Sequence, residues 1–223
     1  NLRGAEMALD ARVDELTVTI SASPTYNRRN VRMEVDESVA VIADVVAAAR
    51  SGSAPVPVDA VVSCAFGSPY EPDLTVDEAV DLGARLADVG VTRLTYADTT
   101  GMATPRRVAE LHAALGGEVD DVGLHLHDTR GTAVVNAYAA LPLGFTRFDT
   151  AVGGLGGSPF AHGAGGNLAT EELVALLDDL GVATGIDVEA LVEVAASVEA
   201  LVGRAVPSGV AHAGPRTRVA TEG

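Results

Sequence analysis

The sequence predicts an α/β fold, a (β/α)8 barrel of the TIM type, from three observations. Short β-rich runs alternate strictly with longer Ala-, Leu- and Val-rich stretches of helical period, which is typical of parallel strands joined by crossover helices. Residues 94–101 and 124–131 repeat a strand that ends in Asp-Thr-x-Gly and leads into a helix, 30 residues apart. No G-x-G-x-x-G follows the first strand, and this disfavours a doubly wound nucleotide-binding sheet.

Five strands and six helices are expected in alternating order. The strands are expected at residues 15–21, 58–66, 91–98, 122–128 and 145–152. The helices are expected at residues 36–50, 76–89, 104–116, 130–142, 170–180 and 187–203. Because such a barrel needs eight strands, residues 1–205 are expected to hold its last five strand–helix units and a C-terminal helix, with the first three units missing. Residues 206–223, which contain two prolines, are expected to form a polar tail.

The composition restricts the chemistry and the partners. A net charge of −16 argues against a nucleic-acid or anionic-membrane partner, and no apolar run is long enough to cross a bilayer. All 15 basic residues are arginines, so a Schiff-base mechanism, which needs a lysine, is excluded, and carbonyl chemistry would need a metal or another electrophile. One cysteine, Cys64, fits a reducing compartment. The Ala-, Val-, Arg- and Asp-rich usage is typical of a GC-rich prokaryotic genome, so the cytoplasm is expected.

Two of the five histidines stand two residues apart at the end of an expected strand. Residues i and i+2 of a strand face the same side, so His125 and His127 are expected to project together at the carboxyl-end mouth, where barrel enzymes build their sites. Two imidazoles there indicate a metal site. The alternative is a pair of hydrogen-bonded histidines that line the interior.

A glycine-rich segment follows the last expected strand. Residues 152–172 hold seven glycines, which allow close approach of backbone to ligand, so we interpret the segment as an active-site loop at the same mouth. Asn167 could add an oxygen ligand there, or it could be an ordinary turn or capping residue. Two histidines and oxygen ligands suit Mg²⁺ or Mn²⁺.

Several motifs resemble those of the hydroxymethylglutaryl-CoA lyase family. They are GLGGSPFAHGAGGNLATE at residues 154–171, HLHDTRG at residues 125–131, VSCAFGSPYEP at residues 62–72 and NLRGAEMAL at the N-terminus. The resemblance covers essentially the whole chain. It implies a metal-dependent lyase on a TIM barrel that cleaves 3-hydroxy-3-methylglutaryl-CoA or a related acyl-CoA by a retro-Claisen reaction. It also implies a role in leucine degradation and a homo-oligomer, expected to be a dimer.

The resemblance assigns roles to the matched residues. Three become ligands of Mg²⁺ or Mn²⁺: His125, His127 and Asn167. Asp98 matches a catalytic aspartate, although a helix cap is the alternative. Glu171 matches a catalytic-site glutamate that would orient Asn167, with a first-turn helix residue as the alternative. Thr95 matches a family residue whose hydroxyl lies near the substrate, and the alternative is that Thr95 faces the core. His125 is also expected to be a neighbour that handles protons.

Two departures from the family pattern bear on activity. The family has a cysteine in the glycine loop that acts as the acid, and Ser158 stands there; a hydroxyl is a far poorer acid near neutral pH. Cys64 lies in another strand and is expected to be a packing residue. The family's Arg-Asp pair from the first strand and a glutamate from the next are not in the sequence. Arg130 is the one arginine expected at the mouth that could stabilise the enolate. The favoured interpretation of Arg130 is a solvated residue at the start of a helix.

Binding of an acyl-CoA would need cations for its phosphates. Arg28 and Arg29 follow the first expected strand and could bind them, or they could belong to a solvated face. The alternatives for function are a related acyl-CoA lyase or Claisen-type synthase with another substrate, and an inactive paralogue or non-catalytic subunit.

Overall fold

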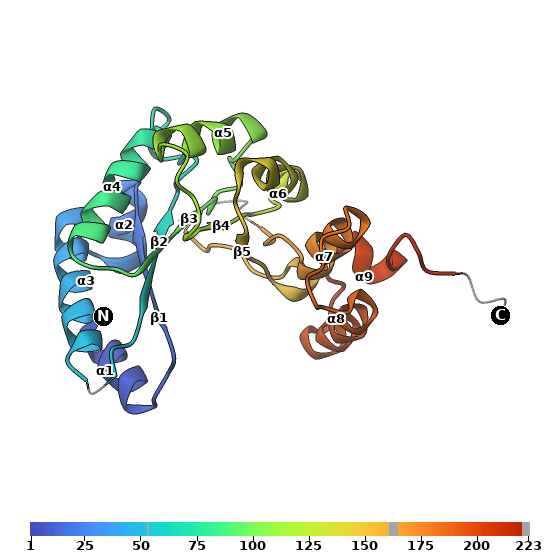
Figure 1. Ribbon diagram of the computed structural model, residues 1–223, viewed down its shortest axis with the longest axis horizontal. Coiled ribbons are helices and arrows are strands. Elements are labelled where there is room, and N and C mark those ends of the chain that lie inside the picture. The colour runs from blue at the N-terminus through green and yellow to red at the C-terminus, as the bar shows by residue number, and fades with distance from the viewer. Residues whose placement is uncertain (53, 161–164, 220–223) are drawn as a thin grey trace.

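A computed structural model describes residues 1–52, 54–160 and 165–219. Its sheet has five parallel strands in chain order, each paired with the next. The strands are β1 (Leu16–Ser21), β2 (Val58–Ser63), β3 (Arg93–Ala97), β4 (Val122–His125) and β5 (Arg147–Asp149). The sheet curves with helices along its outer side, as in part of a barrel (Figure 1). The predicted α/β class and the five strand–helix units are confirmed.

Helices follow the strands as expected. Those of the strand–helix units are α3 (Val35–Arg50), α4 (Val76–Asp88), α5 (Pro105–Ala114), α6 (Ala133–Ala140) and α7 (Thr170–Asp179). The chain starts with α1 (Leu2–Asp10) and, after α7, continues through α8 (Val188–Val202) and α9 (Gly209–Ala213). The helix α2 (Pro24–Val31), between β1 and α3, was not expected from the sequence. Two 3-10 turns cover Leu141–Leu143 and Val152–Gly154.

Local sequence explains the helices of the repeating units, and α4 is an example. Thr75 caps it and forms a reciprocal capping box with Glu78. Its buried face turns toward the sheet, and Gly83 brings the helix so close that a Cβ there would lie 2.2 Å from the hydroxyl of Tyr96 on β3. The core therefore fills the space between the strands and the outer helices.

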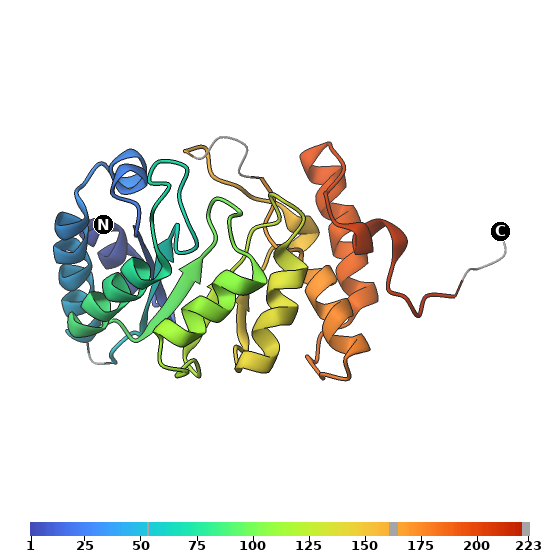
Figure 2. The same ribbon diagram turned by 90° about the horizontal axis from the view of Figure 1, so that it is seen from above.

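The carboxyl ends of the strands share one edge of the sheet. Helix α2, the segment after β2 and the glycine-rich segment after β5 all gather along that edge (Figure 2). The two Asp-Thr-x-Gly turns lie there as well, after β3 and β4. Any site built from strand ends is therefore bordered by these connections.

Two expectations about segment boundaries need correction. The strand predicted at residues 122–128 ends at His125, because residues 126–128 leave β5 and bond instead to the segment around Asn167. The predicted polar tail contains α9, which packs on α7 and α8, and Val206 just before it is buried. A single buried valine and a five-residue helix give too little periodicity for the sequence to reveal them.

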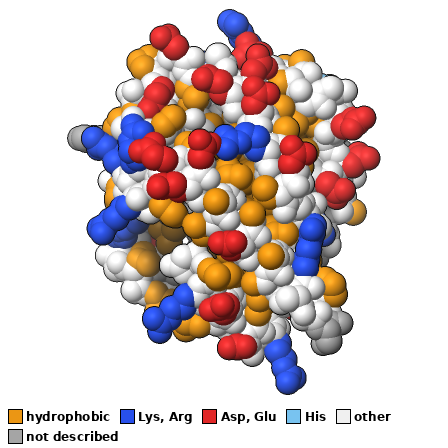
Figure 3. Space-filling model, turned by 90° about the vertical axis from the view of Figure 1, so that its left-hand side faces the viewer, with side chains coloured by type: hydrophobic (Ala, Val, Ile, Leu, Met, Phe, Trp, Pro, Cys, Tyr) orange, Lys and Arg blue, Asp and Glu red, His pale blue; other side chains and the backbone are white. Residues whose placement is uncertain are grey.

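The outer face over the first helices carries mixed charge. Acidic and arginine side chains alternate there with apolar ones (Figure 3). Two ion pairs join different elements of the chain: Arg85 on α4 pairs with Asp36 on α3, and Arg93 on β3 pairs with Glu15 before β1. Among the described residues, no helix has the length and apolarity that crossing a bilayer requires.

Candidate active site

The two histidines of β4 and the turn after it converge at the strand ends. The Nε2 atoms of His125 and His127 lie 3.2 Å apart, and the ring centroids are 5.1 Å apart. His127 is 4% exposed, and burial, followed by the nearby ring of His125, lowers its pKa to about 4. Its imidazole is therefore neutral at neutral pH, which is the form that binds metals.

The backbone of Asn167 lies opposite that of His127 because the glycine-rich segment returns along the end of β4. Residues 126–128 and 166–168 run side by side, and His127 and Asn167 form an antiparallel bridge. The Nδ2 of Asn167 donates to the carbonyl of Leu155 at 2.8 Å, whereas its Oδ1 is buried without a hydrogen-bond partner. The bonds that join the two segments are from Asp128 N to Gly166 O and from Leu168 N to Leu126 O, both 2.9 Å.

These donors fit a divalent cation. A buried amide oxygen without a partner costs free energy unless a ligand or a water satisfies it, and the Nδ1 of His127 is equally unpartnered. Two imidazoles and an amide oxygen are ligands that Mn²⁺ accepts readily. No group of three or more His, Cys, Asp and Glu side chains within the described ranges could hold a metal, so the amide is essential to this set.

Asp149 adds a carboxylate that the sequence analysis missed. It ends β5, and its Oδ2 lies 3.6 Å from Nδ1 of His125, on the far side of the ring from His127. A carboxylate behind an imidazole favours the tautomer that leaves Nε2 free for a ligand. The sequence does place this aspartate at the end of the strand that follows the histidines, and that position was the signal that could have revealed Asp149.

Ser158 lies on a cavity of about 290 Å³ beside both histidines. Its Oγ forms a 2.6 Å hydrogen bond with the hydroxyl of Tyr26 and accepts the backbone N–H of Phe160 at 3.3 Å. Tyr26 belongs to α2, and the sequence analysis did not single it out. Residues 161–164, which belong to the predicted active-site loop, lie outside the described residues.

Asp98 lies beneath the rim and does not line the cavity. It is 1% exposed, and its Oδ1 accepts the backbone N–H groups of Met102 and Ala103 at 2.6 and 2.9 Å. Its Oδ2 is buried and unpartnered. Burial raises the pKa of this carboxyl to about 7, despite the opposing effect of the two N–H groups and of Arg130.

Glu171 does not contact Asn167, contrary to the expectation. Its side chain is fully buried at the start of α7, and both of its oxygens accept the N–H of Gly153, at 3.0 and 3.1 Å. The first turn of α7 directs the carboxylate toward the beginning of the glycine-rich segment rather than toward its end. Glu171 therefore holds the segment that carries Asn167, at a distance from the amide.

Thr95 faces the interior below the cavity, in line with its core-facing alternative. Its hydroxyl is fully buried and lies 3.2 Å from both oxygens of Asp59 on β2. Arg147 on β5 donates to the same carboxylate at 2.9 Å. This polar layer joins strands across the inside of the curved sheet, and it does not bring Thr95 to the residues that line the cavity.

The arginines near the mouth differ in what holds them. Arg28 pairs with Glu34 at 3.0 Å, whereas Arg29 lies over the ring of Tyr70, 4.6 Å from its centroid. The Tyr70 hydroxyl donates to the carbonyl of Phe160, at the cavity. Arg130 is not merely solvated, because it donates to the carbonyls of Thr100 and Gly101. Cys64, by contrast, is a buried packing residue whose pKa burial raises to about 12.

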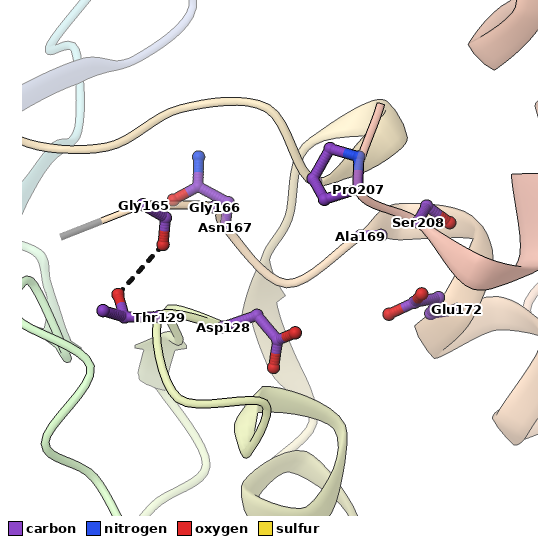
Figure 4. A pocket seen from close by; sticks show the side chains of 10 residues that line it. Asp128, Thr129, Gly165, Gly166, Asn167, Ala169, Glu172, Pro207 and Ser208 are labelled. Atoms are coloured by element: carbon purple, nitrogen blue, oxygen red, sulfur yellow. Dashed lines mark hydrogen bonds between the residues drawn. The ribbon is translucent and has the colours of Figure 1, made fainter. Parts of the chain in front are cut away.

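A second hollow borders the returning glycine-rich segment, and Asn167 lines this hollow rather than the cavity of the two histidines (Figure 4). Asp128 and Glu172 project into it, and Pro207 and Ser208 close it from the chain after α8. Thr129 donates to the carbonyl of Gly165 at 2.9 Å across its edge. This bond further fixes the segment that carries Asn167 against the turn after β4.

The model of the HMGL-like family matches residues 1–198. The chain belongs to this family. The match includes both histidines, Asn167 and the whole sheet, so the family and the curved α/β sheet agree.

The most similar relatives include acyl-CoA lyases. Hydroxymethylglutaryl-CoA lyase YngG of Bacillus subtilis is 38% identical over 93% of this chain and 70% of its own length. The (R)-citramalyl-CoA lyase of Chloroflexus aurantiacus is 37% identical over 96% of this chain and 68% of its own. The structure of an HMG-CoA lyase from A. baumannii with coenzyme A and 3-methylmalate has a TM-score of 0.93 at 37% identity, covering 100% of this chain and 73% of that one. The chain thus spans about two thirds of such relatives and is a member of an acyl-CoA lyase enzyme family.

Proposed function

We propose that this chain forms the metal-binding part of a carbon–carbon lyase that cleaves 3-hydroxy-3-methylglutaryl-CoA, or a close 3-hydroxy-3-carboxyalkyl-CoA, by a retro-Claisen reaction. The products would be acetyl-CoA and a keto acid. The observation that supports the proposal is the 3.2 Å approach of His125 and His127, which line one cavity with Ser158, together with the backbone bridge that places Asn167, whose Oδ1 has no partner, opposite His127. Membership of the HMGL-like family supports it.

Each residue receives a role that its position allows. His125, His127 and Asn167 would hold Mg²⁺ or Mn²⁺, which would polarise the hydroxyl and a neighbouring oxygen of the substrate. We assign His125, with Asp149 behind it, to the path of the substrate's hydroxyl proton. Because a ligated nitrogen cannot itself be a free base, His125 would act as a neighbour of the base and not as the base. Ser158, which lines the same cavity, would give the proton to the enolate carbon.

Two further residues support these groups without touching the substrate. Asp98 and Glu171 line no part of the cavity, and their carboxylates hold the turn after β3 and the start of the glycine-rich segment. They would keep the rim in place while the reaction proceeds.

The thioester would approach along α2. Arg29, stacked on Tyr70 next to the cavity, is better placed than Arg28, whose charge Glu34 already neutralises. We expect Arg29→Ala to raise the KM for the thioester several-fold and Arg28→Ala to change it less. Equal KM values for the two variants and the wild type would remove both arginines from CoA binding.

Two other functions remain as candidates. The citramalyl-CoA lyase among the relatives favours a substrate other than 3-hydroxy-3-methylglutaryl-CoA, and Ser158 in place of a thiol agrees with a change in chemistry. An inactive paralogue or non-catalytic subunit is the alternative from another class. We place the protein in the cytoplasm, in agreement with its free buried cysteine, and we carry over from the family resemblance a dimer with a role in leucine degradation.

The test is release of acetyl-CoA by the intact protein from 3-hydroxy-3-methylglutaryl-CoA and from citramalyl-CoA, with Mn²⁺, with Mg²⁺ and with a chelator. The proposal predicts metal-dependent release from at least one thioester, and faster release from Ser158→Cys. No release from either thioester by either protein would support the inactive paralogue.

A further inference from the structure

We propose that Tyr26 and Ser158 act as a hydroxyl pair, in which the phenol of Tyr26 positions Ser158 and replenishes the proton that Ser158 gives to the substrate carbon. The inference rests on the proposed lyase function, and it extends that function to a residue on α2. The two hydroxyls are 2.6 Å apart although 132 residues separate them in the chain.

The hydrogen bonds around Ser158 are compatible with proton transfer from Tyr26 through Ser158 to the cavity. Its Oγ accepts the backbone N–H of Phe160 at 3.3 Å and lies 2.6 Å from the Tyr26 hydroxyl. When Tyr26 donates, the oxygen of Ser158 has accepted two hydrogen bonds, and its own proton is left to point into the cavity. His125 and His127 line the same cavity.

Other hydroxyl groups on the cavity are already engaged with the protein. Thr19 and Ser63 lie 3.2 Å from each other, and Thr99 accepts the N–H of Cys64 at 3.0 Å. Among the described hydroxyls that line the cavity, Ser158 and Tyr26 are the pair that joins the glycine-rich segment to another element. The orientation of the Ser158 hydroxyl therefore depends on a contact between these two elements.

Tyr26 is held more rigidly than Ser158. Its residue is 4% exposed, and its backbone N–H donates to the capping hydroxyl of Ser23 at 3.0 Å. The ring packs with Cys64 and Leu74 and meets the ring of Phe160 edge to face. A fixed phenol can therefore set the orientation of a serine that belongs to a loop.

The proton balance closes without another reagent. As the new C–H bond of the acetyl group forms, the O–H bond of Ser158 breaks, and the Tyr26 proton moves to the serine oxygen. The resulting phenolate takes up one proton from the solvent. The substrate hydroxyl releases one proton to the solvent when the C–C bond breaks, so the net change in protons is zero. Burial raises the pKa of Tyr26, against the effect of the Ser158 hydrogen bond, and Cys64 and Tyr70 add to the increase, so the phenol carries its proton at neutral pH.

A double-mutant cycle tests the pair by acetyl-CoA release. In the wild-type background, Tyr26→Phe should lower kcat by about 100-fold, which is the size of a lost proton-transfer contribution. It should leave KM nearly unchanged. In the Ser158→Cys background, whose thiol is acidic enough alone, Tyr26→Phe should lower kcat by less than about 3-fold. Tyr138→Phe, on the exposed face of α6, is the matched control and should leave kcat unchanged.

Three results would overturn the inference. An equal loss from Tyr26→Phe in both backgrounds would show a merely structural tyrosine, and no loss in either would show a tyrosine without a role. If neither the wild type nor Ser158→Cys releases acetyl-CoA, the lyase function and the hydroxyl pair are rejected together, so the two failures are distinguishable.

The ionisation of a thiol at position 158 gives a readout that does not need turnover. The pH dependence of alkylation by iodoacetamide should show a higher thiol pKa in Tyr26→Phe/Ser158→Cys than in Ser158→Cys, because a phenol that donates stabilises the thiolate. Cys64, buried and with a pKa of about 12, should not react. Identical alkylation profiles would show that the phenol does not act on this position.

Discussion

The two Asp-Thr-x-Gly units have nearly the same turn and different chemistry. In both turns the glycine N–H donates to the aspartate carbonyl, Gly101 to Asp98 at 2.9 Å and Gly131 to Asp128 at 3.0 Å. Both glycines have a φ in the left-handed region, +63° and +69°, which other residues rarely adopt. The repeated motif therefore encodes a turn, and nothing in the turn itself makes a site.

The two units differ in the side chains on the strand before each turn and in the segment that packs against each turn. The second unit brings His125 and His127 where the first has Thr95 and Ala97. It is also the unit along which the segment with Asn167 returns. A candidate site thus needs two contributions, side chains on the strand end and a second segment held beside them.

The largest effect is expected from His127→Ala in the second unit. It removes one imidazole from the proposed ligand set, so Mn²⁺ should bind at least about 100-fold more weakly, and lyase activity should fall with it. His112→Ala, on the last turn of α5, should leave the Kd for Mn²⁺ unchanged. Isothermal titration of both variants decides the matter, and an unchanged Kd for His127→Ala would mean that the second unit is no different from the first.

A smaller effect is expected where the glycine-rich segment is held. Glu171→Gln places an amide against the N–H of Gly153 and leaves a buried donor poorly satisfied, which should cost about 1–3 kcal/mol of unfolding free energy. The neighbouring Glu172→Gln, a half-buried side chain, should cost less. Urea unfolding of the two variants measures the difference, and equal midpoints would show that the Glu171 contact does not hold the segment.

The smallest effect, counted per pH unit, should come from the first unit, through the buried carboxyl of Asp98. Burial raises its folded pKa to about 7, above the unfolded value of about 3.9, so between these pH values only the folded state keeps the proton. Stability is therefore lost as pH rises through this window, by at most about 1.4 kcal/mol per pH unit. Asp98→Asn cannot ionise, so its stability relative to the wild type should increase from pH 5 to pH 7.

Chemical unfolding at the two pH values, with a chelator present, checks this expectation. A constant difference between Asp98→Asn and the wild type would show that the carboxyl titrates in the folded protein as it does in the unfolded chain.

Much of the fold followed from the sequence because alternation and spacing are local signals. The convergence of His125 and His127 also followed, since residues two apart on a strand share a side and the turn after β4 kept that direction. Asn167 could be associated with them because a loop after one parallel strand lies at the same edge as its neighbour. These inferences needed only the topology of a parallel sheet.

The remainder depended on contacts between distant segments. The binding of Glu171 to Gly153 rather than to Asn167 depends on how α7 approaches the glycine-rich segment, which no spacing reveals. Tyr26 was missed because α2 is short and its hydrogen bond to Ser158 joins this helix to the distant glycine-rich segment. The burial of Asp98, which determines its pKa, likewise results from packing against the second unit.

The central claim is that the second unit and the returning segment together hold a divalent cation. Pulsed electron paramagnetic resonance of the intact protein with one equivalent of Mn²⁺ tests it most directly. The account predicts nitrogen couplings from two imidazoles in the wild type and from one in His127→Ala. Mn²⁺ that shows only water and carboxylate oxygen, with no nitrogen coupling, would contradict it.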